Sequence, residues 1–149
     1  MATLNVEIVT PEGSLWSGDA RAAMARSSVG EFTVLPQLTD TVGDLVPGIV
    51  RVDTGEGEQS FVVHGGYFQV EHGGPDGVTR ATVLAGVAER TGDIDVARAE
   101  RARERAEQAM AAETRGEPEE RPAHLWAPAA LARAQLRLRA AGRAQRADT

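Results

Sequence analysis

VTRATVLAGVAERTGDIDVARAERARERAEQA, residues 78–109, contains the change of pattern that decides the fold. Up to Ala85 apolar and polar residues alternate, which is typical of a β-strand with one buried face. Further on, alanines recur at intervals of three and four, at positions 99, 102, 106 and 109, which is the spacing of one helical face. We therefore expect a β domain over residues 1–88 and a helical domain over residues 89–149.

Short alternating runs fill the first part of the chain between glycine- and proline-containing turns. The runs at residues 4–8, 32–35, 49–53, 59–63, 67–72 and 78–85 are each long enough for one strand. The segments 54–58 and 73–77 are rich in glycine and should close hairpins between neighbouring strands. Many short strands at this spacing predict an antiparallel β-sandwich or flattened barrel.

The second part of the chain predicts two antiparallel helices, at about 94–113 and 128–146, and so an α+β protein that ends in a helical hairpin. Asp93 is the candidate N-cap of the first helix. A connection at 114–127, rich in proline and glutamate, separates it from a second helix whose apolar face is Ala130, Ala134, Leu138 and Ala141. Alanine faces bury little apolar area, so this hairpin is either a detachable switch or an ordinary tail.

Composition excludes several functions. Cysteine is absent and all 16 basic residues are arginine, which removes thiolate chemistry and lysine-based phosphate or Schiff-base sites. The net charge of -6 argues against nucleic-acid binding. The three histidines are scattered, no catalytic motif occurs, and no apolar run approaches the length of a transmembrane helix. We expect a non-catalytic chain that requires no cofactor and meets membranes only through partners.

Five ordered blocks resemble the epsilon subunit of F-type ATP synthases. They are VTPE at 9–12, WSG at 16–18, GEFTVLP at 30–36, LVPG at 45–48 and GGYFQV at 65–70. Each is weak alone, but their order and spacing ahead of a helical hairpin make the resemblance specific. The chain departs from the family after Pro36, where Gln37 and Leu38 replace the usual Gly-His, and its connection is longer.

The resemblance implies a rotor subunit in the central stalk. The β domain would bind the gamma subunit and the c-ring during proton-driven ATP synthesis, peripherally, at the cytoplasmic face of the cell membrane. The hairpin would transiently reach the catalytic alpha/beta ring and restrain ATP hydrolysis. The implied partner contacts are Glu31, Pro36, Gln37, Leu38, Arg139 and Arg143. The alternative is a β-sandwich ligand-binding or adaptor module with a helical interaction tail.

The segment 94–99 fits the I/L-D-x-x-R-A pattern with which some bacterial epsilon subunits bind ATP. The resemblance implies a regulatory ATP site formed by Glu89, Ile94, Asp95, Arg98, Ala99, Arg105, Arg133 and Arg137. Arginines spaced by four or seven residues share a helical face and can gather around phosphates. The alternative is that they pair with glutamates on a solvated helix. We expect no metal site.

Overall fold

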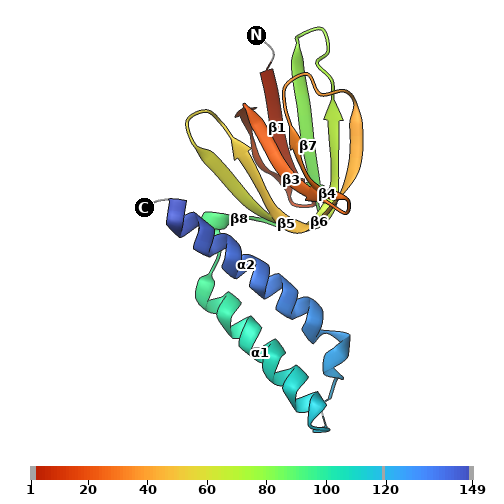
Figure 1. The fold of residues 1–149 in the computed structure, drawn as a ribbon, viewed down its shortest axis with the longest axis vertical. Helices are drawn as coiled ribbons and strands as arrows, with labels where there is room; N and C mark the ends of the chain where they lie inside the picture. The colour runs from red at the N-terminus through yellow and green to blue at the C-terminus, as the bar shows by residue number, and fades with distance from the viewer. Residues whose placement is uncertain (1–2, 119, 148–149) are drawn as a thin grey trace. The chain divides into compact units, whose positions relative to one another are not determined.

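The computed structural model describes residues 3–118 and 120–147, which form two compact units meeting in sequence at Arg90 and Thr91. The first, the β unit, contains eight strands that fold over a shared core (Figure 1). Their bounds are β1 Thr3–Thr10, β2 Gly13–Ala20, β3 Ala22–Ser27, β4 Gly30–Val34, β5 Thr41–Asp53, β6 Glu58–Glu71, β7 Val78–Ala85 and β8 Ala88–Arg90.

The strands run in the order β2-β1-β7-β6-β5-β3-β4, and β8 pairs with β6. The segments expected to close hairpins do so, between β5 and β6 and between β6 and β7. One pair differs from the antiparallel sheet that the sequence predicts, because β1 and β7 are parallel. Alternate residues of β1 and β7 point inward and are buried, among them Leu4, Val6, Ile8 and Val83, and Phe61 of β6 is buried in the same core.

The sequence pattern missed strands where apolar alternation is weak. Strands β2 and β3 were not predicted, because Gly, Ser, Asp and Ala interrupt the pattern there. Strand β6 was predicted as two strands, broken at Gly65 and Gly66, but it continues through both residues. Both glycines have positive φ angles, of 90° and 147°, which allow the backbone to bend without ending the ladder.

Gly66 is also a point of close backbone approach. A β-carbon at this position would lie 2.1 Å from the Leu84 carbonyl oxygen on the paired strand β7. No side chain fits at that distance without displacing the backbone. The glycine pair is therefore required by the packing of β6 against β7.

The helical unit contains two long helices, α1 at Val96–Thr114 and α2 at Ala127–Ala147, with short 3-10 turns η1 at Thr91–Asp93 and η2 at Ala123–Leu125. The two helices contact each other along their length (Figure 1). Alanines line both faces: Ala99, Ala106 and Ala109 on α1, and Ala127, Ala134 and Ala141 on α2 are buried. The small side chains allow close approach, as the sequence predicts.

The expected N-cap at Asp93 is wrong, and Asp95 takes that role. Asp93 lies in η1, so the α-helix begins at Val96 rather than at Ile94. The Asp95 carboxylate accepts a hydrogen bond of 3.0 Å from the backbone N–H of Arg98. This satisfies one of the free amides of the first turn. Among the described residues, no helix has the length and hydropathy needed to cross a bilayer.

Candidate functional site

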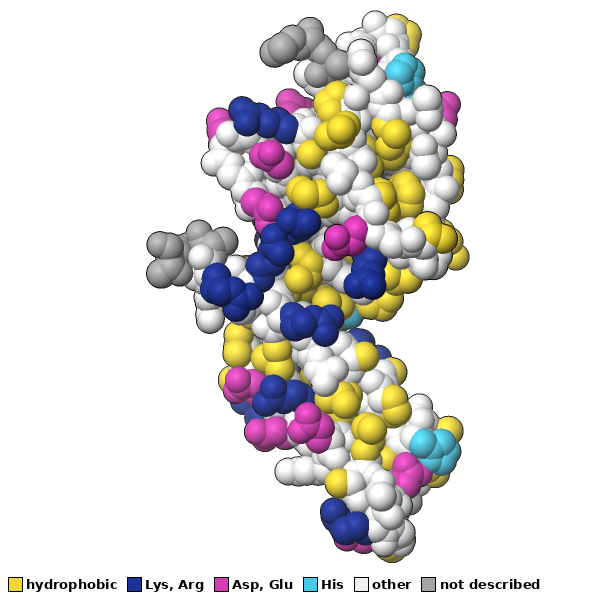
Figure 2. Space-filling view, in the orientation of Figure 1, with side chains coloured by type: hydrophobic (Ala, Val, Ile, Leu, Met, Phe, Trp, Pro, Cys, Tyr) yellow, Lys and Arg dark blue, Asp and Glu magenta, His cyan; other side chains and the backbone are white. Residues whose placement is uncertain are grey.

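An apolar patch on the outward face of the β unit is the first candidate surface. Tyr67 and Leu84 are paired across β6 and β7, and their exposed fractions are 64% and 44%. Val42 on β5 pairs with Gln69, which lies two residues from Tyr67 on β6, so Val42 and Tyr67 are on the same outward face of the sheet. Val42 is 76% exposed. We call Val42, Tyr67 and Leu84 the outer-face patch. Figure 2 shows that hydrophobic side chains gather on the visible surface of the β unit.

The loop after β4 contains most of the partner contacts that the resemblance implies in the β unit. Gln37 is exposed and has a φ of 71°, the left-handed region that favours glycine. Its backbone N–H donates a 2.8 Å hydrogen bond to the hydroxyl of Thr79, which is fully buried and anchors the loop. Leu38 packs against the core, and Pro36 is half-buried. Of the expected β-unit contacts, Glu31 and Gln37 are therefore exposed, and Pro36 and Leu38 are half-buried.

Glu89 belongs to the β unit, whereas the other members of the expected ATP site belong to the helical unit. It lies on β8 in the β unit, where its carboxylate approaches the Nε2 of His64 at 3.4 Å. The Asp95 carboxylate caps α1. Ala99 is buried, whereas the Arg98 side chain is exposed.

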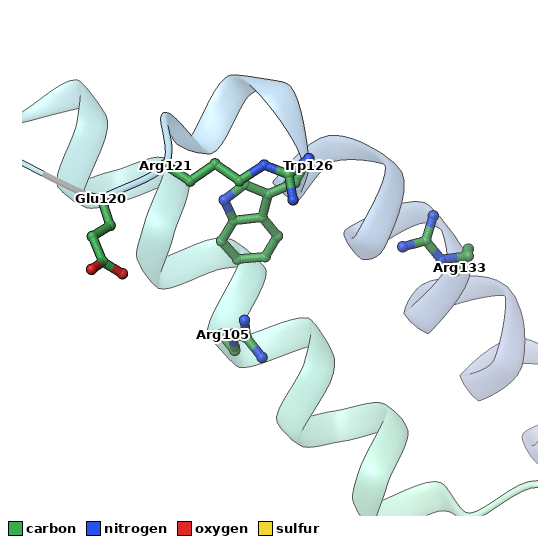
Figure 3. A pocket seen from close by; sticks show the side chains of 5 residues that line it. All are labelled: Arg105, Glu120, Arg121, Trp126 and Arg133. Carbon is green, nitrogen blue, oxygen red and sulfur yellow. The ribbon is translucent and has the colours of Figure 1, made fainter.

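Arg105 and Arg133 are the two expected site residues that the structure brings together. They line an open hollow of about 480 Å³, with Glu120, Arg121 and Trp126. The Arg105 guanidinium carbon lies 5.2 Å from the centre of the Trp126 ring, a cation–π contact. In Figure 3 the Trp126 indole lies between the guanidinium groups of Arg105 and Arg121, with Arg133 on the α2 side. We call these five residues the tip pocket.

Arg98 and Arg137 do not line the tip pocket, and three residues that do were not predicted as site residues. Glu120, Arg121 and Trp126 belong to the connection and its end, where proline and glutamate predict a solvated link. Of these three residues, only Trp126 could have been identified from the sequence. It is one of only two tryptophans, and an aromatic ring beside a helix start commonly anchors packing.

A clasp between Glu113 and His124 fixes the connection to the end of α1. One oxygen of the Glu113 carboxylate accepts a 2.7 Å hydrogen bond from the His124 backbone N–H, and the other contacts the His124 Nδ1. The hydrogen bond with the His124 side chain is the main reason that the pKa of Glu113 lies below its ordinary value. Ala123 beside the clasp is fully buried. The clasp thus anchors the end of the connection to α1.

Metal-ligating side chains do not gather anywhere in the part of the chain that the structure describes: no group of three or more His, Asp or Glu is placed to hold an ion. The two candidate binding surfaces are the outer-face patch, which is apolar, and the tip pocket, which is lined by three arginines. The first suits a protein partner and the second an anion.

Two family models cover nearly the whole chain. Residues 3–91 match the model described as ATP synthase, Delta/Epsilon chain, beta-sandwich domain. Residues 93–142 match the model described as ATP synthase, Delta/Epsilon chain, long alpha-helix domain. The two matches meet close to the junction between the β unit and the helical unit.

Curated relatives of this chain are named ATP synthase epsilon chain. The chain is 41% identical over 112 residues to an ATP synthase epsilon chain of Anoxybacillus flavithermus, covering 75% of this chain and 79% of the relative. It is 43% identical over 112 residues to that of Desulforudis audaxviator, covering 74% and 77%. A chain in the solved Euglena gracilis mitochondrial ATP synthase superposes with a TM-score of 0.63 at 22% identity, covering 93% and 76%. That superposition shows a shared fold.

Proposed function

This chain belongs to the epsilon-chain family of the ATP synthases, whose members are non-catalytic subunits, and from this premise we propose that it is a rotor subunit of the central stalk. In this role it binds the gamma subunit and the c-ring, so that these parts turn together during proton-driven ATP synthesis. Membrane association is then peripheral, at the cytoplasmic face, through those partners. Family membership sets aside the alternative of an adaptor outside the ATP synthases.

The outer-face patch is the observation that carries this proposal. A sheet face that is exposed in a single chain normally carries polar side chains, yet Val42, Tyr67 and Leu84 are all well exposed. Aromatic side chains are enriched at the buried centres of protein interfaces, and Tyr67 lies between the other two strands of the patch. We assign this patch to the gamma subunit. We assign the c-ring contacts to the exposed residues Glu31 and Gln37.

Binding of the chain to the isolated gamma subunit from the same source tests this assignment. Tyr67→Glu combined with Leu84→Glu places two carboxylates in the patch, and should weaken binding by roughly 30-fold or more, or about 2 kcal/mol. Val29→Glu is the matched control, because Val29 is 95% exposed in the turn between β3 and β4, outside the patch. Equal affinities for the double variant and the control would reject the assignment.

The helical unit is proposed to restrain ATP hydrolysis by transient contact with the catalytic alpha/beta ring. Its interface is built from alanines with few larger side chains, so separating the helices exposes little apolar area. Arg139 and Arg143 are exposed on α2 and are the proposed contacts, since arginines on a helix can pair with acidic surfaces. A complex reconstituted with Arg139→Gln and Arg143→Gln should hydrolyse ATP faster than one with the unaltered chain.

Regulatory ATP binding by the hairpin is a second proposal, favoured by the shared position of Arg105 and Arg133 in the tip pocket. Segment 94–99 would contribute Arg98, and Arg137 would complete the set. Calorimetry of the full chain with ATP tests it, repeated on Arg98→Ala and Arg133→Ala. Both variants should bind ATP more weakly than the unaltered chain. No measurable heat at millimolar ATP would reject the proposal.

A further inference from the structure

A tight turn after β4 presents Gln37 to solvent. The turn comprises residues 35–38 and is closed by a 3.2 Å hydrogen bond from the Leu38 N–H to the Leu35 carbonyl oxygen. Gln37 takes the third position, with a φ of 71°. Glycine is favoured at the third position of a turn with this conformation, because a β-carbon is crowded there. The glutamine therefore keeps backbone strain that a glycine would remove.

The Gln37 side chain gains nothing inside the chain that would offset this strain. Gln37 is exposed, and among the residues that the structure describes no hydrogen bond to its side-chain amide is present. Strained residues other than glycine cluster at binding sites and ligand clamps, where the surrounding structure holds them in place. The strain at Gln37 thus indicates that its side chain has a role outside the chain.

Thr79 holds the turn from inside the β unit. It lies on β7 and is fully buried, and its hydroxyl accepts a 2.8 Å hydrogen bond from the Gln37 backbone N–H. A buried side chain on a paired strand has little freedom to move, because the interior around it is closely packed. Thr79 cannot touch a partner itself. Any effect of its hydroxyl on binding must therefore pass through Gln37.

His72 holds the residues that follow the turn. It comes directly after β6, and its backbone N–H donates a 2.7 Å hydrogen bond to the Asp40 carboxylate. Its Nδ1 lies 3.2 Å from the Leu38 carbonyl oxygen, which can only accept, so Nδ1 is the donor. Together with the Thr79 hydroxyl, three hydrogen bonds fix residues 37–40 to β7 and to the loop after β6.

The loop that carries His72 is itself tightly closed. A β-carbon at Gly73 would lie 2.9 Å from the Gly77 carbonyl carbon, so the two ends of the loop are in contact. Asp76, in the same loop, forms an ion pair with Arg80 of β7. His72 therefore extends from a loop of restricted shape, and it can hold residues 38–40 in one position.

We propose that the three residues that hold this segment, Thr79, His72 and Asp40, are positioning residues for the c-ring contact. They keep the Gln37 side chain in the orientation that meets the c-ring. The inference rests on the proposed assignment of the c-ring contacts to Glu31 and Gln37. A segment already fixed in its bound conformation loses less conformational entropy on binding, which raises affinity. The amide of Gln37 both donates and accepts, so it fits a polar loop of the c-ring.

Binding of the full chain to the c-ring from the same source, held in lipid nanodiscs, tests the proposal. Thr79→Val removes the hydroxyl with almost no change in shape. It should weaken binding by about 5-fold or more, because the Gln37 N–H loses its acceptor and the turn loses its anchor. Thr79→Ser keeps a hydroxyl and should recover most of the affinity. Equal affinities for Thr79→Val and the unaltered chain would overturn the proposal.

Thr54→Val is the matched control. Thr54 follows the other end of β5, where its hydroxyl makes a hydrogen bond of the same length, 2.8 Å, to the Gly57 carbonyl oxygen. Its loss should change the c-ring affinity by less than about 2-fold. Affinity for the gamma subunit, measured in parallel, should be unaffected in Thr79→Val, because the outer-face patch is intact. Equal losses of gamma and c-ring affinity would indicate general unfolding and would overturn the proposal.

Asp40 separates positioning from direct contact through charge. Asp40→Asn keeps the oxygen that accepts from His72 but removes the charge, so c-ring affinity should stay within about 2-fold. Asp40→Ala removes the oxygen as well and should weaken binding by about 5-fold, as Thr79→Val does. Equal losses in the two Asp40 variants would indicate a direct charge contact and would overturn its positioning role.

Gln37→Gly distinguishes this proposal from the assignment on which it rests. The variant should raise the urea midpoint of the β unit, because strain is relieved, and yet weaken c-ring binding by about 5-fold or more. A purely structural residue would change both quantities in the same direction. Weaker c-ring binding in Gln37→Gly with no effect of Thr79→Val would leave the assignment standing and overturn the positioning proposal. Unchanged c-ring binding in Gln37→Gly would overturn both.

Discussion

Gly66→Ala should destabilise the β unit by about 2–6 kcal/mol, for two reasons that add. The φ angle of 147° is one that side chains rarely adopt, and holding a non-glycine residue there costs about 1–3 kcal/mol. The new β-carbon would also lie 2.1 Å from the Leu84 carbonyl oxygen, and relieving such overpacking costs about 1–3 kcal/mol. Domains of this size have unfolding free energies of about 5–15 kcal/mol, so the loss would be a large share of the total.

Urea unfolding followed by Trp16 fluorescence measures this loss, in a Trp126→Phe background that removes the signal of the helical unit. Trp16 packs against the core, with its ring centre 5.8 Å from that of Phe61, so its emission reports on the β unit. At an m-value of about 2 kcal/mol/M, the midpoint should fall by about 1 M or more.

Gly86→Ala is the control, because a β-carbon there would meet nothing within 4 Å and the residue has no positive φ. Its effect should stay within about 0.5 kcal/mol. A Gly66→Ala midpoint equal to that of Gly86→Ala would refute the reasoning, since neither strain nor close approach would then constrain the strand.

Three further predictions concern backbone strain, helix capping and pH. Gln37→Gly should raise the free energy of unfolding of the β unit by about 0.5–1 kcal/mol, because relief of left-handed strain exceeds the entropy cost of glycine; a lower urea midpoint would contradict this. Asp95→Ala should destabilise the helical unit by about 1 kcal/mol in thermal unfolding followed by circular dichroism, and Asp93→Ala by clearly less. The clasp lowers the pKa of Glu113, so its contribution is present above the ordinary value of 4.5 and is lost as pH falls through the lowered folded-state pKa. An NMR titration of the Glu113 carboxyl carbon should therefore have its midpoint below 4.5, and His124→Ala should raise that midpoint, because the side-chain hydrogen bond is the largest cause of the lowered pKa.

Much of the fold could be predicted from local patterns. The inward residues of β7 and the buried alanines of α1 follow from periodicity alone, because burial on one face imposes that spacing. On α2 only Ala134 and Ala141 of the expected face are buried, and Ala130 and Leu138 are half-buried. The family resemblance was confirmed by models covering both units. The parallel pairing of β1 with β7 joins strands at opposite ends of the β unit's sequence, and no local pattern encodes it.

The candidate site was less predictable, for a physical reason. The tip pocket depends on Arg121 and Trp126 meeting residues of α1 and α2, and this requires the connection to fold back. The Glu113 and His124 clasp produces that fold, yet the two residues are separated by proline and glycine, which favour a solvated loop in sequence reasoning. The N-cap of α1 is Asp95 and not the expected Asp93, because the 3-10 turn η1 precedes the helix. Periodicity does not detect a feature of one turn.

ATP hydrolysis by the reconstituted ATP synthase tests the central claim that the β unit attaches the chain to the rotor while the helical unit restrains hydrolysis. The measurement compares complexes carrying the full chain with complexes carrying a chain that ends at Gly92, after the β unit. The shorter chain should assemble in the same amount and give a hydrolysis rate several-fold higher. Equal hydrolysis rates would contradict the restraint, and failure of the shorter chain to assemble would contradict attachment through the β unit.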